Sequence, residues 1–130
     1  MRSPILIPPA LAVLLLASVD AMAQTPQRIH FTKGATAGVV KGSIKGFAYK
    51  DYVIGAKAGQ QMSVTLSSNN SYAVFVITSI NGHANNMSET TEWDQTLSES
   101  GDYVVRVLMM RANARRKGAK TNYTLTVAIR

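Results

Sequence analysis

The sequence predicts an all-β protein whose fold is an antiparallel β-sandwich of about eight strands. Short runs in which apolar and polar residues alternate recur along the chain, which is the pattern of strands with one buried face. Clusters of Gly, Asn and Ser separate these runs, as is typical of turns between antiparallel strands. A helical pattern occurs only at residues 111–117, and it is too short to change the fold class.

The first half of the sandwich has four predicted strands, at residues 28–32, 39–44, 49–56 and 62–66. Alternation is clearest in the last two of them. Tyr52 and Ile54 share one face of the third strand, and Met62 and Val64 share one face of the fourth. Gly59 marks the turn between these two strands.

The second half has four more predicted strands, at residues 72–77, 93–97, 103–110 and 123–129. The first of these is almost continuously apolar, which favours a strand that is covered on both sides. In the last one Tyr123, Leu125 and Val127 alternate with polar or small residues. This is the clearest amphipathic strand of the chain.

Residues 1–23 have the features of an export signal rather than of a folded segment. Arg2 supplies a positive start, residues 5–17 are mostly apolar, and Ala21 and Ala23 stand at the small-residue positions before a cleavage site. The apolar stretch is shorter than the roughly 20 residues that a membrane-spanning helix needs. We therefore predict cleavage after Ala23, no membrane span and a single domain at residues 24–130. A retained N-terminal anchor is the alternative.

The composition argues against an enzyme. The chain has 130 residues, a net charge of +7 and no cysteine, which excludes a disulfide framework, a thiolate metal site and a cysteine nucleophile. His30 and His83 lie in no catalytic or metal-binding motif. We interpret Glu92 and Asp94 as solvated acids beside Trp93 rather than as the paired carboxylates of a glycosidase. The sequence predicts a binding module without enzyme activity, metal or cofactor.

A basic surface near the C-terminus is the first feature that points to a partner. No acidic residue occurs in residues 103–130, which contain Arg106, Arg111, Arg115, Arg116, Lys117 and Lys120. If residues 111–115 form a helical turn, Arg111 and Arg115 emerge from the same side. Guanidinium groups bind carboxylates and phosphates bidentately, although a solvated connection that keeps a sheet edge soluble has the same composition.

The second feature is the run Ser100-Gly101-Asp102-Tyr103 at the start of a predicted strand. Glycine suits a turn, and a tyrosine at this place often packs its ring at the corner between two sheets. An exposed Ser-Gly turn can equally be a recognition loop. The sequence leaves open whether Tyr103 contacts a partner or is a structural corner residue.

The same residues resemble a known family. Residues 100–115 are similar to the periplasmic inhibitors of i-type and g-type lysozymes. Further motifs of that family occur in the same order along the chain, as Phe31-Thr-Lys-Gly34, Gly42-Ser-Ile-Lys-Gly46, Ala56-Lys-Ala-Gly-Gln60 and Asn122-Tyr-Thr-Leu125. The resemblance covers nearly all of residues 31–129 and is weakest over 69–95. It implies a periplasmic β-sandwich that blocks a host or competitor lysozyme by inserting loops into the active cleft.

The resemblance also implies contact residues. In the i-type inhibitors a Ser-Gly-x-Tyr loop enters the lysozyme cleft, which implies contacts from Ser100, Gly101 and Tyr103. In the g-type inhibitors two arginines four residues apart are central, which implies Arg111 and Arg115.

The sequence departs from the g-type pattern at Phe47, where that class has a contact tyrosine. The aromatic ring is kept and the hydroxyl is missing. The sequence therefore does not decide between the i-type and g-type classes.

Two alternatives to inhibition remain. The basic surface would suit an anion binder, with nucleic acid or lipopolysaccharide phosphates as ligand, and export argues against nucleic acid. A sugar-binding sandwich without inhibitory activity is the other alternative. An exposed sheet edge would also allow a homodimer.

Overall fold

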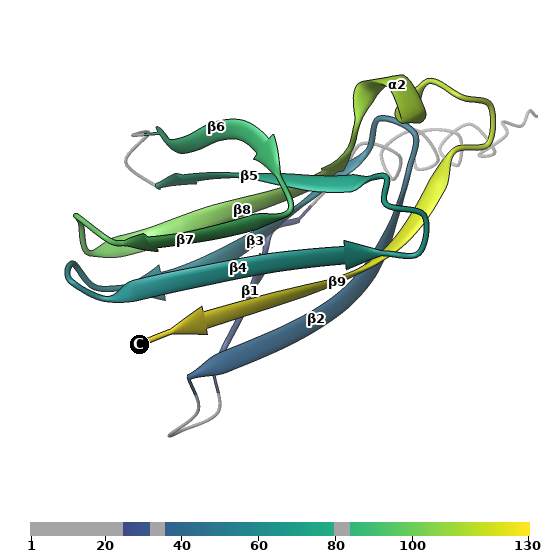
Figure 1. Cartoon of the computed structure of the whole chain (residues 1–130). Helices are drawn as coiled ribbons and strands as arrows, with labels where there is room; N and C mark the ends of the chain where they lie inside the picture. Colours follow the sequence, from purple (N-terminus) through teal and green to yellow (C-terminus); the bar gives the residue numbers. More distant parts are fainter. Residues whose placement is uncertain (1–24, 32–35, 80–83) are drawn as a thin grey trace, which may run out of the picture.

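Figure 1 shows the computed structural model of the protein, which describes residues 25–31, 36–79 and 84–130. Two β-sheets lie face to face, so the predicted all-β sandwich is confirmed. The elements are β1 (Gln27–Arg28), β2 (Ala37–Lys45), β3 (Tyr49–Ala56), β4 (Gln61–Ser68), β5 (Ala73–Ser79), β6 (Ala84–Thr90), β7 (Glu92–Thr96), β8 (Gly101–Met109), α2 (Arg111–Ala114) and β9 (Lys120–Ile129).

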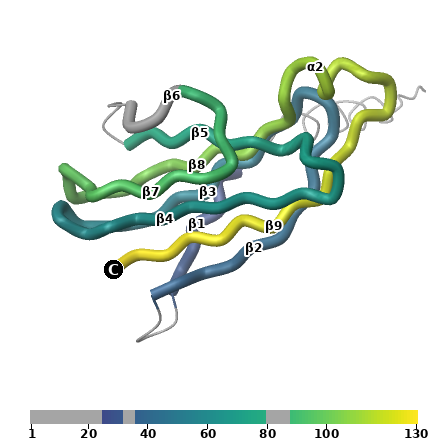
Figure 2. The backbone as a smooth tube through the Cα atoms, viewed as in Figure 1, coloured from purple at the N-terminus to yellow at the C-terminus, as the bar shows by residue number. Residues whose placement is uncertain are grey.

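Hydrogen bonding orders the strands into a five-stranded sheet, β1-β3-β8-β5-β6, and a four-stranded sheet, β2-β9-β4-β7 (Figure 2). All neighbouring strands are antiparallel except β1, which runs parallel to β3. Seven of the eight predicted strands are present, whereas the strand predicted at 28–32 shares only Arg28 with β1, and residues 29–31 are not in a strand. Strand β6 is an addition that the sequence did not predict, because Ala-Asn-Asn-Met-Ser-Glu-Thr has no alternation of apolar residues.

The core lies between the inner faces of the two sheets. On β9, Leu125 and Val127 are fully buried, and Tyr123 and Tyr52 place their hydroxyl oxygens 2.6 Å apart in a buried hydrogen bond. Burial raises the pKa of Tyr123, and the bond to Tyr52 raises it further. Gly42 faces this pair, and a Cβ atom there would lie 2.6 Å from the Tyr123 hydroxyl oxygen. Glycine is therefore required at this position by space rather than by backbone conformation.

The turns gather at two ends of the sandwich (Figure 1). We call the end with turns 46–48, 69–72 and 110–119 the α2 end. We call the opposite end, with turns 57–60 and 97–100, the β7–β8 end. Strand β8 connects them, since it begins at the β7–β8 end and leads into α2.

The described residues include no helix that is long and apolar enough to cross a membrane. The predicted cleavage site after Ala23 and residue His83 lie outside the described residues.

Candidate functional site

The turn before β8 carries the first predicted recognition group. Ser100 is exposed, and its Oγ accepts a hydrogen bond from the backbone N–H of Ala58 at 2.9 Å. Gly101 has φ of +140°, a conformation that residues with a side chain rarely adopt. Ser100 therefore ties the turn at 97–100 to the turn at 57–60, while its own hydroxyl hydrogen is still available to a partner.

Tyr103 lies in the core rather than on the surface. Its exposed fraction is 1%, and its hydroxyl donates a hydrogen bond to the carbonyl oxygen of Glu99 at 2.7 Å. This is the structural corner role, one of the two that the sequence left open. The ring is buried, and a contact of Tyr103 with a lysozyme stays a prediction of the i-type mode. Of the predicted loop, Ser100 and Gly101 are exposed.

A salt bridge beside this turn fixes the start of β8. The guanidinium nitrogens of Arg28 donate to both carboxylate oxygens of Asp102, at 3.0 and 2.7 Å. The hydrogen bonds from Arg28 lower the pKa of Asp102 below its ordinary value. Since both side chains are partly exposed, the pair fixes geometry more than it adds stability.

At the α2 end the predicted helical turn is present. The backbone N–H of Arg115 donates to the carbonyl oxygen of Arg111 at 3.2 Å, so the two side chains emerge from the same side of the turn. Both residues are exposed. Within the described part of the chain, neither guanidinium has an ion-pair partner. Their N–H groups are therefore available to an acidic partner.

The turn between β4 and β5 holds the segment that carries these arginines. Ahead of α2, the backbone N–H of Met110 donates to the carbonyl oxygen of Tyr72 at 3.0 Å. Behind it, the side-chain amide of Asn70 donates to the carbonyl oxygen of Lys120 at 3.0 Å. The Asn70 Oδ1 atom also accepts from the buried hydroxyl of Thr121 at 2.6 Å. Both ends of the arginine segment are thus attached to one turn.

Phe47 projects beside α2 from the turn between β2 and β3. It is 68% exposed, which is unusual for so large an apolar side chain. Together with Arg111, Leu108, Met109 and Glu89 it lines a recess of about 330 Å³. In the sequence, Phe47 stands out only by its missing hydroxyl. Leu108 and Glu89 gave no signal, because only the fold brings these strands next to the β2–β3 turn.

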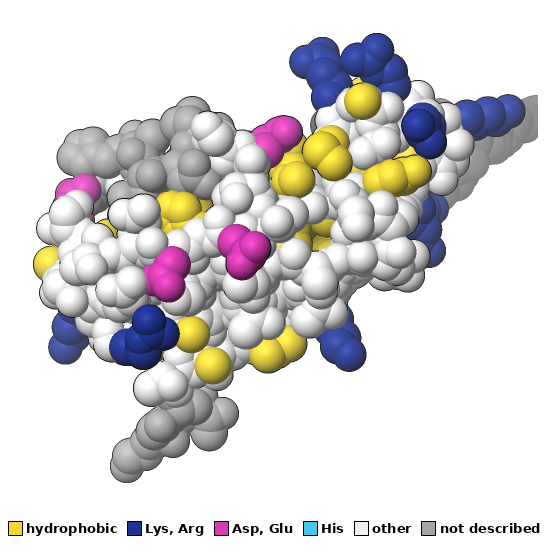
Figure 3. Space-filling model, in the orientation of Figure 1, with side chains coloured by type: hydrophobic (Ala, Val, Ile, Leu, Met, Phe, Trp, Pro, Cys, Tyr) yellow, Lys and Arg dark blue, Asp and Glu magenta, His cyan; other side chains and the backbone are white. Residues whose placement is uncertain are grey.

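Not all of the predicted basic surface belongs to this end. Figure 3 shows Lys and Arg side chains gathered over α2 and the loop after it. Arg106 lies in the middle of β8 instead, where it donates to the two carboxylate oxygens of Asp51 at 2.8 and 3.0 Å. Its guanidinium carbon is also 3.9 Å from the centre of the Tyr49 ring. The charge of Arg106 is thus paired with that of Asp51 on the sheet face, and the basic surface is smaller than predicted.

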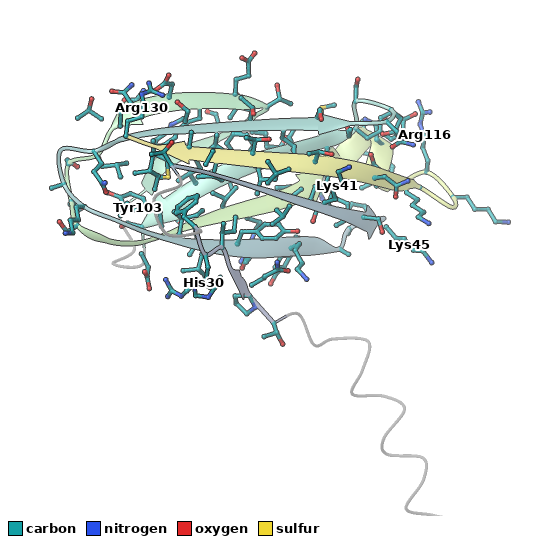
Figure 4. All side chains as sticks on the ribbon, turned by 90° about the horizontal axis from the view of Figure 1, so that it is seen from below. His30, Lys41, Lys45, Tyr103, Arg116 and Arg130 are labelled. Atoms are coloured by element: carbon teal, nitrogen blue, oxygen red, sulfur yellow. The ribbon has the colours of Figure 1, made fainter. Side chains whose placement is uncertain are left out.

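The two groups of predicted contact residues are far apart. Ser100 precedes β8 and Arg111 follows it, and a strand of 9 residues spans roughly 30 Å. Figure 4 shows the same separation, with Tyr103 toward one end of the molecule and Arg116 at the other. The structure therefore brings Arg111, Arg115 and Phe47 together and leaves Ser100 and Gly101 at the opposite end.

In comparisons with known proteins, the chain is similar to inhibitors of g-type lysozyme. No model of a protein family matches the chain. The chain is 31% identical to an inhibitor of g-type lysozyme from Escherichia coli over 126 residues, which is 92% of this chain and 94% of the relative. The crystal structure of a periplasmic inhibitor of g-type lysozyme from Aeromonas hydrophila is 33% identical, with a TM-score of 0.73 over 82% of this chain and 96% of that one. A domain of a Bacillus anthracis collagenase shares the fold alone, at 15% identity and a TM-score of 0.61 over 81% of this chain and 96% of that domain.

Proposed function

This chain belongs to the family of g-type lysozyme inhibitors, and we propose that it inhibits a g-type lysozyme in the periplasm through its α2 end. The observation that carries the proposal is the pair Arg111 and Arg115, four residues apart on one turn and exposed beside Phe47. Of the two classes that the sequence left open, this favours the g-type.

The chemistry of the α2 end suits a lysozyme cleft. Enzymes that cleave glycosidic bonds keep acidic groups in a cleft that is shaped for a sugar chain. Two guanidinium groups on one turn can form bidentate hydrogen bonds with such carboxylates. Phe47 adds apolar surface next to them, and apolar area excludes water from the contact. Occupation of the cleft is sufficient for inhibition, so the protein needs no catalytic group of its own.

Net charge opposes the encounter, and local pairing has to outweigh it. The chain carries +7, and a cationic lysozyme would be repelled at long range. Salt at about 0.15 M shortens the range of this repulsion to about 8 Å. Contacts at 3 Å or so, such as guanidinium to carboxylate, are within that range and are much less screened. We infer that raising the salt concentration speeds association while weakening the ion pairs themselves.

The proposal also covers processing of the chain, enzyme activity and the i-type mode. We infer that residues 1–23 are removed on export and that residues 24–130 form the working domain. We infer that the protein is not an enzyme, since its relatives are inhibitors. Ser100 and Gly101 remain the predicted contacts of an i-type mode, for which the exposed turn is the only support.

The test is inhibition of cell-wall lysis by g-type and i-type lysozymes. Arg111→Ala and Arg115→Ala should each weaken g-type inhibition about 30-fold, which corresponds to the roughly 2 kcal/mol of an arginine hot spot. Lys57→Ala is the matched control, because it removes one positive charge from the β7–β8 end. Melting temperatures should be unchanged in all three variants. Equal effects of Lys57→Ala and Arg111→Ala would show that net charge, not this site, governs inhibition.

A further inference from the structure

Polar side chains form three rows across the outer face of the four-stranded sheet. Directly paired residues on neighbouring strands place their side chains on the same face of a sheet. The rows, as the strand register sets them, are Lys41, Thr124 and Ser67; then Ser43 and Asn122; then Lys45 and Lys120 at the α2 end.

The first two rows line an open groove of about 680 Å³. Besides Gly42, Ser68, Asn69 and Tyr123, the groove is lined by row residues whose side chains carry hydroxyls, an amide and one ammonium group: Lys41, Ser43, Ser67, Asn122 and Thr124. Among the residues that the structure describes, these side chains have neither an ion pair nor a side-chain hydrogen bond. Both donors and acceptors are therefore free, which suits a ligand with many hydroxyl groups.

The third row is electrostatically unfavourable in the protein alone. Lys45 and Lys120 are paired directly opposite each other on β2 and β9, and like charges in that position destabilise a sheet. Lys45, Lys120 and Arg116 are three cations around one recess of about 370 Å³. The other lining residues, Gly46, Gly118 and Ala119, have small side chains or none.

Arg116 is held in place at this recess. Its guanidinium donates to the hydroxyl of Tyr72 at 3.3 Å and lies 5.9 Å from the centre of that ring. Figure 4 shows Arg116, Lys45 and Lys41 toward the same end of the molecule. The recess thus has one fixed guanidinium and two ammonium groups, with no acidic residue among its lining residues.

We propose that this face binds a phosphorylated glycan, with a phosphate group between Lys45, Lys120 and Arg116 and the sugar along the groove. A phosphate dianion offsets the repulsion of the two lysines and accepts the hydrogen bonds of a guanidinium. The hydroxyl and amide rows then meet sugar hydroxyls. The rows contain no aromatic side chain on which a base could stack, which disfavours a single-stranded nucleic acid.

The groove is separate from the proposed lysozyme contact, whereas the cationic recess shares the α2 end with it, since Gly46 and Arg116 adjoin Phe47 and Arg115 in the chain. The groove is on the four-stranded sheet, whereas the recess between Phe47 and Arg111 has its floor on β8 of the five-stranded sheet. Because the two proposals name different side chains, each can fail without the other.

The experiment is an NMR titration of the protein purified from the periplasm with glucosamine 6-phosphate, glucosamine, inorganic phosphate, an oligothymidine and phosphatidylglycerol vesicles. Glucosamine 6-phosphate should shift the backbone signals of Lys45, Lys120 and Arg116 and of the adjacent row, Ser43 and Asn122, whereas inorganic phosphate should shift those of Lys45, Lys120 and Arg116 alone. Lys45→Gln and Lys120→Gln should each weaken the sugar phosphate at least about tenfold, in line with the loss of one charged hydrogen bond. Asn122→Ala should weaken the sugar phosphate and leave inorganic phosphate unchanged.

Further readouts distinguish this site from general basicity. Lys57→Gln, at the β7–β8 end, should leave every titration unchanged, and Lys45→Gln should slightly raise the melting temperature at low salt because it removes the repulsion. Four results would overturn the proposal. The first two are an absence of shifts with glucosamine 6-phosphate at millimolar concentration and equal losses of sugar-phosphate affinity in Lys57→Gln and Lys45→Gln. The other two are tighter binding of an oligothymidine or of the vesicles than of the sugar phosphate, and a loss of lysozyme inhibition in Lys45→Gln without any phosphate binding. The last would assign the cations to the lysozyme contact instead.

Discussion

The β7–β8 end and the α2 end of the sandwich expose different kinds of group and are held by different kinds of contact. At the β7–β8 end, the turn before β8 is braced by Ser100 on Ala58, Tyr103 on Glu99 and Arg28 on Asp102. Its polar groups are largely used inside the protein. At the α2 end the bracing is done by backbone groups and Asn70, behind the exposed surface.

This difference shows where binding free energy is available. A side chain that already has a protein partner gives little net gain when a lysozyme replaces that partner, because one hydrogen bond is exchanged for another. Arg111 and Arg115 have no ion pair to lose among the described residues, and most of the Phe47 ring is exposed. The α2 end is therefore the better contact surface, and the other end is the better anchor for the fold.

The largest effect should follow from removing the brace behind the arginines. Asn70→Ala takes away the bond to Lys120 and leaves the buried hydroxyl of Thr121 without this acceptor. We expect a loss of roughly 2 kcal/mol in unfolding free energy, the net value of about two hydrogen bonds, since Asn69 Oδ1 at 3.3 Å stays as a weaker acceptor for Thr121. Inhibition measured below the melting temperature should also weaken, since the segment at 110–120 loses one attachment.

Denaturant unfolding and inhibition assays on the same samples check this prediction. Ser71→Ala in the same turn is the control for stability, because no hydrogen bond of its side chain would be lost. Full inhibition by a destabilised Asn70→Ala protein would show that the arginines do not need this attachment. Loss of a structural hydrogen bond would then leave inhibition unchanged at the α2 end as well as at the β7–β8 end.

The effect of removing the aromatic side chain of Phe47 should be smaller than that of Asn70→Ala. It should be larger than that of any change at the β7–β8 end. Phe47→Ala should weaken g-type inhibition about tenfold, which is about 1.4 kcal/mol, and leave the melting temperature unchanged because the ring is 68% exposed. Phe47→Tyr restores the hydroxyl of the g-type pattern and should inhibit at least as well as the wild type. A fall in melting temperature with unchanged inhibition would make Phe47 a packing residue.

Most of the fold could be predicted because the inner faces of the strands follow a simple alternation. Tyr123, Leu125 and Val127 are all buried, as the pattern requires. Strand β6 could not be predicted, since its sequence is polar and its position depends on pairing with β5. The parallel pairing of β1 with β3 could not be predicted either, because a strand of two residues has no periodic pattern.

The candidate site was predictable only in part. The spacing of Arg111 and Arg115 was sufficient to expect a common side, because a helical turn fixes residues four apart. Arg106 could not be separated from them, since its pairing with Asp51 is a contact between residues far apart in the sequence. Tyr103 stayed ambiguous because burial, not residue type, decides between a contact and a corner.

Tyr103→Phe probes the anchor role of the β7–β8 end. It keeps the buried ring and removes the hydroxyl that donates to the carbonyl oxygen of Glu99. We expect a loss of about 1 kcal/mol in unfolding free energy, and no change in g-type inhibition once the folded fraction is taken into account. Unfolding curves and inhibition titrations on one sample measure both. A loss of affinity at unchanged stability would move the lysozyme contact to this end.

The smallest effect should come from the exposed turn itself. Ser100→Ala removes the acceptor for the Ala58 N–H group, which is solvent-exposed and can bind water instead, so the change in unfolding free energy should be under about 0.5 kcal/mol. Inhibition of g-type lysozyme should be unchanged, because Ser100 is one strand length away from Arg111. Inhibition of an i-type lysozyme is the sharper measurement, since in that mode the hydroxyl would enter the cleft. If the protein inhibits an i-type lysozyme and Ser100→Ala abolishes it, while Arg111→Ala does not, both ends are binding surfaces and the contrast between contact and anchor fails.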